Sequence, residues 1–64
     1  MKIVFMVVNL EGDTESEKVV EVKDTSTLRQ LDDMASGFLE DWCITANVQN
    51  DPIQYQYNWY EIRA

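Results

Sequence analysis

A run of six apolar residues, Ile3–Val8, constrains the fold more than any other feature of this sequence. Most of its members are β-branched or aromatic and none is polar, so the run predicts a strand that is buried on both faces. A chain of 64 residues buries only about 60% of the surface that it exposes when unfolded. We therefore expect a single domain, residues 1–64, with this strand at the centre of a small sheet.

The segment after this strand predicts a hairpin and then a helix. Glu11–Glu17 has no apolar residue and is expected to form the turn, and the alternation in Lys18–Lys23 predicts a second strand. Thr27 is followed three positions later by Gln30, the spacing of a capping box, which marks the start of a helix. Apolar residues then recur at three- and four-residue steps, and this stripe is expected to cover a sheet face. Its members are Leu28, Leu31, Ala35, Phe38, Leu39 and Trp42, with Trp42 closing the helix.

The last third of the chain is expected to complete the sheet. Apolar and polar residues alternate in Cys43–Gln49, which predicts a third strand, and Asn50-Asp51-Pro52 is a strong turn signal. Ile53–Ile62 predicts the last strand, with a bulge near Asn58. The predicted fold class is α+β, of order ββαββ, with a four-stranded mainly antiparallel sheet and one amphipathic helix packed on one face.

Acidic residues outnumber basic ones. Twelve Asp and Glu residues against five Lys and Arg residues give a net charge of −7. A surface of this sign repels phosphate groups, so neither nucleic acid nor an anionic membrane surface is expected as a direct partner. No segment approaches the ~20 apolar residues that span a bilayer. The charge serves either solubility alone or recognition of a basic surface on another protein.

The sequence lacks the residue types on which most catalytic and metal sites depend. It has no histidine and one cysteine, so neither histidine-based acid–base catalysis nor a zinc site is expected. Its two glycines cannot build a glycine-rich phosphate loop. Cys43 has no partner for an internal disulfide, which favours a reducing cytoplasm. We predict that the chain is not an enzyme and has no catalytic residue, no cofactor and no metal ion.

The predicted hairpin turn carries an acidic residue at every second position: Glu11, Asp13, Glu15 and Glu17. In an extended segment such carboxylates lie ~6.6 Å apart, close to the ~6.8 Å rise of two base steps on one DNA strand. The spacing suggests mimicry of a row of phosphates. The alternative is a solvated hairpin tip with no partner.

The predicted helix carries a second acidic group. Glu40 and Asp41 fall in its expected last turn, where the helix dipole disfavours each negative charge by ~0.3–1 kcal/mol. Asp32 and Asp33 extend the acidic surface toward the helix start. Gly37 costs ~1 kcal/mol relative to alanine, so it is interpreted either as a place where a partner approaches closely or as neutral drift.

Three aromatic residues, Tyr55, Tyr57 and Trp59, share one face of the last predicted strand. They either pack under the helix as core or form a surface patch of the kind enriched in protein interfaces. Because one helix covers only one face of a sheet, we expect this stripe to be partly exposed. The candidate protein-binding residues are therefore this stripe together with the acidic residues of the hairpin and the helix.

The segment VEVKDTSTLRQL, a strand that runs through Asp-Thr-Ser-Thr into a leucine-bearing helix, resembles the strand-to-helix junction of ubiquitin-like β-grasp domains. The second half of the chain lacks that family's diglycine tail, so conjugation does not carry over. The whole chain is similar to short phage proteins, with an apolar Met-Lys strand, an acidic turn and an aromatic last strand. Its size, acidity and strand–helix order also resemble those of anti-CRISPR proteins, the small phage inhibitors of host defence. This resemblance implies a phage origin, action in the host cytoplasm and a protein target.

The leading hypothesis is a non-enzymatic inhibitor that presents its carboxylates to a basic groove on a host defence protein that handles nucleic acid. The alternative is a small structural or assembly module that self-associates, as in a homodimer, through its aromatic sheet face. A third hypothesis, sequestration of a small signalling molecule between aromatic side chains, is disfavoured by the net charge, because such signals are usually anionic nucleotides.

Overall fold

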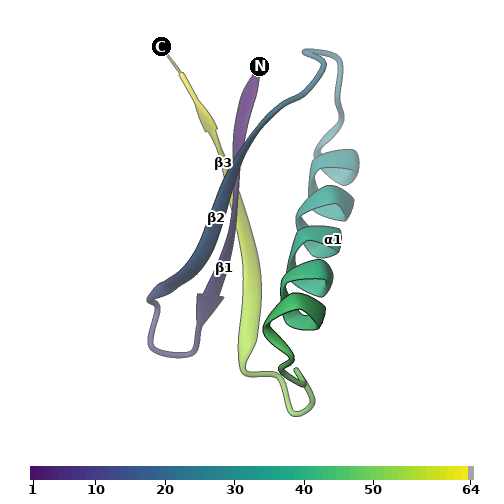
Figure 1. Cartoon of the computed structure of the whole chain (residues 1–64). Coiled ribbons are helices and arrows are strands. Elements are labelled where there is room, and N and C mark those ends of the chain that lie inside the picture. The colour runs from purple at the N-terminus through teal and green to yellow at the C-terminus, as the bar shows by residue number, and fades with distance from the viewer. Residues whose placement is uncertain (64) are drawn as a thin grey trace.

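The computed structural model describes residues 1–63, which form a three-stranded antiparallel sheet with one helix against one of its faces (Figure 1). The elements follow the order β1 (Lys2–Asn9), β2 (Thr14–Glu21), α1 (Leu28–Ala46) and β3 (Tyr55–Ile62). The sheet order is β2-β1-β3, so the all-apolar strand lies at the centre, as predicted. The α+β class is also confirmed.

The predicted four-stranded ββαββ sheet is wrong, because Cys43–Gln49 does not form a strand. The helix continues past Trp42 to Ala46, and the sheet of the described residues has three strands. No glycine or proline interrupts the chain here before Asn47, which adopts a left-handed conformation (φ 56°, ψ 43°). The Asn47 N–H donates to the carbonyls of Cys43 and Ile44 and ends the helix. An alternation this short is compatible with either element.

The start of the helix is where the sequence predicted it. The Thr27 hydroxyl accepts a hydrogen bond of 3.2 Å from the Gln30 N–H, and the Gln30 side chain accepts one of 2.9 Å from the Thr27 N–H. Both bonds of the capping box are therefore present, and they satisfy two backbone donors that a helix otherwise leaves free.

The hairpin turn is shorter than Glu11–Glu17, because β2 already begins at Thr14. The Asn9 side-chain oxygen accepts hydrogen bonds from the N–H groups of Glu11 (2.9 Å) and Asp13 (3.0 Å). Gly12 supplies the positive φ of 87° that the turn requires. The pairing of β1 with β2 shifts register between Val7 and Val8, whereas that of β1 with β3 is continuous, so the predicted bulge near Asn58 is wrong.

The core lies between the helix and the central strand. Ile3 and Phe5 of β1 pack with Leu31 and Ala35 of α1, and all four side chains are buried. The helix packs against β1 and β3 rather than β2, and it leaves the opposite sheet face uncovered. In Figure 1 the β1–β2 turn and the C-terminal end of α1 lie at the same end of the molecule, opposite the chain termini.

Candidate functional site

The eight carboxylates that the sequence singled out are all exposed. None of them forms an ion pair within residues 1–63, where the ion pairs involve other acidic residues. The Met1 amino group pairs with Glu21 and Asp24, and Arg63 pairs with Glu61. The unpaired set is Glu11, Asp13, Glu15, Glu17, Asp32, Asp33, Glu40 and Asp41.

The acidic residues of the hairpin do not form one extended row. Glu11 and Asp13 lie in the turn, where Asn9 holds their backbone N–H groups, and only Glu15 and Glu17 lie on β2. The Glu15 carboxylate accepts a hydrogen bond of 3.2 Å from the Asn9 side chain. The regular spacing that would match a row of phosphates is therefore lost at the turn.

The acidic residues of the helix lie in two groups. The prediction that Glu40 and Asp41 lie in the last turn is wrong, because the helix continues to Ala46 and its last turn carries no charged residue. The dipole penalty falls off within the last turn, so it weighs little on these two residues. Asp32 accepts a hydrogen bond of 2.9 Å from the Tyr57 hydroxyl, which links its carboxylate to β3.

The aromatic stripe of β3 faces the helix. Tyr57 and Trp59 pack against the core, and the Tyr55 ring meets the Trp42 ring edge-on at 4.9 Å between centroids. All three members of the stripe are half-buried, but they pack under the helix as core residues, so they do not form the surface patch that the sequence favoured. The hydrogen bond to Asp32 raises the pKa of Tyr57, and desolvation and the charges of Asp32 and Asp33 act in the same direction.

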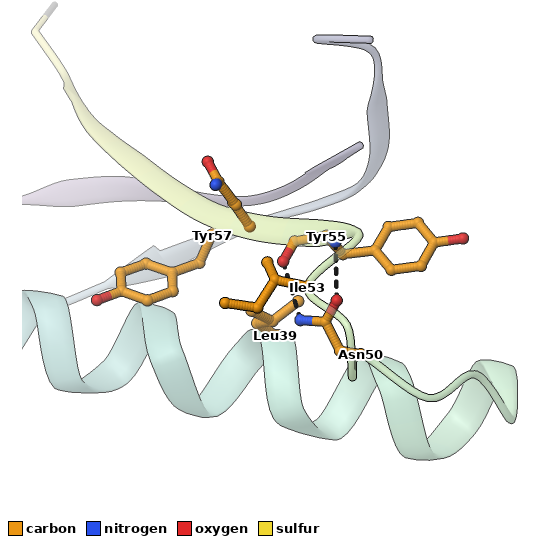
Figure 2. A pocket seen from close by; sticks show the side chains of 6 residues that line it. Leu39, Asn50, Ile53, Tyr55 and Tyr57 are labelled. Atoms are coloured by element: carbon orange, nitrogen blue, oxygen red, sulfur yellow. Dashed lines mark hydrogen bonds between the residues drawn. The ribbon is translucent and has the colours of Figure 1, made fainter. Parts of the chain in front are cut away.

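A hollow of about 430 Å³ lies where β3 meets the helix, and Figure 2 shows its lining from close by. Leu39, Ile53 and Tyr57 supply apolar walls. Asn50 lies at its edge, but its amide is already engaged: its oxygen accepts from the Tyr55 N–H (2.8 Å) and its nitrogen donates to the Tyr55 carbonyl (2.9 Å). The hollow therefore offers apolar contact and little polar orientation for a ligand. The sequence analysis named Tyr55 and Tyr57 as candidate binding residues, but it assigned Asn50 only to a turn and did not predict a hollow here.

A groove of about 310 Å³ lies between the helix and the edge strand β2. Its walls are mostly apolar, and it carries one basic and one acidic side chain. The lining residues are Phe5, Lys18, Val20, Met34, Gly37, Phe38 and Asp41. The groove exists because the helix lies over β1 and β3 and leaves β2 without a cover. Gly37 within the helix was the one signal in the sequence that pointed to it.

The sheet face away from the helix carries exposed apolar side chains. Val4 of the central strand lies opposite Val19 of β2 and Tyr60 of β3. These neighbours leave Val4 only 3% exposed, while Val19 and Tyr60 are themselves 55% and 51% exposed. Ile62, which lies opposite Lys2, extends this patch along β3. The apolar surface of the open face is thus built by residues other than the predicted stripe.

Residues 1–63 contain no candidate metal site and no candidate membrane span. No group of three or more Cys, Asp or Glu side chains in residues 1–63 is arranged to hold a metal ion. The single helix of this part of the chain is not apolar enough to cross a membrane.

Comparison with known proteins yields no relative. No protein-family model matches the chain, and neither a curated protein nor a solved structure matches it.

Proposed function

We propose that this chain is a protein-binding module whose acidic surface recognises a basic surface on another protein. One observation carries the proposal: the eight carboxylates of the hairpin and helix are exposed and lack ion pairs within residues 1–63. A surface adapted only for solubility intersperses charges of both signs. Here the free carboxylates repel one another, and a basic partner relieves that repulsion.

The charge also determines how such a partner is found. A net charge of −7 on a chain of this size attracts a basic surface over distances of about a Debye length, ~8–10 Å at physiological salt. Association is therefore fast at low ionic strength and slows as salt is added.

In its finer form, the proposal makes the partner a host defence protein that handles nucleic acid, and the chain a phage-type inhibitor that acts in the host cytoplasm. A groove that binds phosphates is basic, and carboxylates complement it as phosphates do. Occupation of the groove is then sufficient for inhibition, and no chemical step is required of the inhibitor. Because the hairpin carboxylates do not form a straight row, recognition depends on overall charge rather than on a copy of phosphate spacing.

Retention experiments with a charge-neutralised variant test the proposal. The purified chain is immobilised and exposed to a bacterial lysate, beside a variant with Glu40→Gln and Asp41→Asn and a charge-preserving control with Glu40→Asp and Asp41→Glu. We expect a retained protein that leaves the neutralised variant at lower salt than the other two, and that duplex DNA displaces. Retention that is independent of salt and indifferent to DNA would contradict the proposal.

A second candidate is self-association through the open sheet face. Val19, Tyr60 and Ile62 are exposed around the buried Val4, and apolar surface of this kind is common in interfaces between copies of one chain. This differs from the predicted interface, because Tyr55, Tyr57 and Trp59 face the helix instead. The native mass in solution, measured at low and high salt, tests self-association. A dimer that persists at high salt and is lost on Tyr60→Ser supports it. A monomer at both salt concentrations contradicts it.

A further inference from the structure

We propose that the edge of β2 and the groove beside it bind an extended, basic segment of a partner protein, which joins the sheet as a fourth strand. This inference rests on the proposed function, since the partner is the same basic protein. It adds the surface that is used and the conformation of the segment that is bound.

The groove is placed to receive the side chains of such a strand. A strand added beside β2 extends the sheet on the side that the helix leaves open, and every second side chain of this strand then lies on the same face as the groove. Val20 lies at its floor, and Met34 and Phe38 of the helix form its wall. Short apolar side chains of the added strand would therefore cover the open side of the groove and pack beside Val20 and the helix residues of its wall.

The backbone of β2 presents free hydrogen-bonding groups at this edge. The Val22 N–H donates to the Met1 carbonyl at 2.9 Å, so Val22 points its backbone groups toward β1. In an antiparallel pair this direction alternates along the strand. Glu17, Val19 and Glu21 consequently turn their N–H and C=O groups outward, where a partner strand can bind them.

The presence of a glycine, Gly37, in the helix wall of the groove is a second, independent observation that indicates an occupant. A glycine within a helix costs ~1 kcal/mol relative to alanine. The fold itself does not require it, because a Cβ atom at this position would meet nothing within 4 Å. Gly37 lies in the wall of the groove, where the lack of a side chain lets another chain approach the helix closely. The cost is thus explained by an occupant of the groove.

Charge selects a basic occupant over a second copy of this chain. Glu17 and Glu21 lie on the face of β2 that points away from the helix, on either side of Val19. Lysine or arginine side chains of an added strand would lie beside them. In a symmetric pairing of two β2 strands about Val19, Glu17 of one copy would face Glu21 of the other, and directly opposed like charges destabilise a sheet.

A blocked peptide of alternating lysine and valine is a direct probe. Its lysines would lie opposite Glu17, Val19 and Glu21, with their backbone N–H groups toward β2, and its valines would enter the groove. A control peptide of the same sequence carries a methyl group on the backbone nitrogen of each lysine, which keeps the charge and removes those donors. We expect the control to bind at least about tenfold more weakly, because it lacks the three lysine N–H donors that face β2. Bound peptide should also slow hydrogen exchange at the Val19 amide.

A variant pair tests the groove without touching β2. Gly37→Leu fills the groove from the helix, while Ser36→Leu adds the same side chain to the same helix outside the groove. We expect Gly37→Leu to weaken peptide binding about tenfold and Ser36→Leu to leave it unchanged, with equal helix content by circular dichroism.

Two outcomes overturn the inference. If both peptides bind equally and Gly37→Leu has no effect, the acidic surface binds basic chains without strand addition, and the proposed function stands without this mode. If neither peptide binds at low salt, strand addition at β2 is excluded, and the proposed function is then judged by the retention of lysate proteins on the neutralised variant.

Discussion

The Tyr57 hydroxyl donates a hydrogen bond of 2.9 Å to the carboxylate of Asp32 and so connects the middle of β3 to the first half of the helix. The bond joins a member of the predicted aromatic stripe to a member of the predicted acidic surface. The two candidate surfaces are therefore in contact, and a partner that binds the helix carboxylates near Asp32 also meets the edge of the aromatic stripe.

Substitution of Asp32 should lower the pKa of Tyr57 toward the ordinary tyrosine value. The hydrogen bond to the carboxylate favours the neutral phenol and raises this pKa, and the charges of Asp32 and Asp33 add to the effect. Phenolate absorbance measured during an alkaline titration should show one tyrosine of Asp32→Asn that ionises at lower pH than in the unchanged chain. Asp51→Asn, which changes an exposed carboxylate that does not contribute to the raised pKa of Tyr57, should leave the titration unaltered.

The hydrogen bond between Tyr57 and Asp32 also predicts how the stability of the fold changes with pH in the alkaline range. The pKa of Tyr57 is raised on folding, so the protonated side chain stabilises the folded state. This stabilisation is fully present below the ordinary tyrosine pKa and is lost as pH rises through the raised pKa. The melting temperature should therefore fall less steeply over this alkaline range in Tyr57→Phe than in the unchanged chain. If the melting temperatures of the two proteins fell in parallel with rising pH, ionisation of Tyr57 would not contribute to the loss of stability.

The capping box predicts a specific loss of helix stability. Thr27→Ala removes the hydroxyl that accepts from the Gln30 N–H, and such changes cost about 0.5–2 kcal/mol. Urea denaturation followed by circular dichroism measures the loss. Thr25→Ala, at an exposed threonine outside the capping box, is the matched control and should change the free energy of unfolding by much less. Equal losses in the two variants would show that the cap contributes nothing.

The sequence predicted those elements that local signals define. The apolar run predicted the central strand, and Thr27 with Gln30 predicted the start of the helix. The end of the helix was not predicted, because the apolar–polar alternation of Cys43–Gln49 fits a strand as well as a helix. Ile44 belongs to this alternation, yet it lies on the helix and is 73% exposed. A strand needs a neighbour in the sheet, and the sequence does not say whether one is there.

The sequence predicted which residues are candidates for the binding surfaces, but not which way their side chains face in the fold. Exposure of the acidic residues follows from their charge. The aromatic stripe faces the helix because Tyr57 lies opposite Val7 and Trp59 lies opposite Phe5, a register that only the folded sheet specifies. The groove beside β2 depends on where the helix axis crosses the sheet, and nothing in the periodicity of the helix indicates this.

The ion pairs of the Met1 amino group are predicted to stabilise the fold most near neutral pH. The Met1 amino group lies 2.7 Å from Asp24 and 3.2 Å from Glu21. The hydrogen bond to Asp24 raises the pKa of the amine, and the same bond lowers the pKa of Asp24. Asp24→Asn should therefore lower the melting temperature at neutral pH. The difference should shrink in acid, as pH falls through the lowered pKa of Asp24, and in alkali, as pH rises through the raised pKa of the amine. A difference that stays constant across this range would show that Asp24 acts without its charge.

Gly37→Ala separates the role of this glycine in the fold from its role in the groove. The added Cβ meets nothing within 4 Å, so no clash opposes the higher helix propensity of alanine. The variant should be more stable than the unchanged chain by about 1 kcal/mol in urea denaturation. Ser36→Ala, at the preceding exposed helix position, is the control for a propensity change away from the groove, and its gain should be smaller because serine already forms helices better than glycine. A loss of stability in Gly37→Ala would mean that the fold itself requires the glycine, and its place in the wall of the groove would then need no partner to explain it.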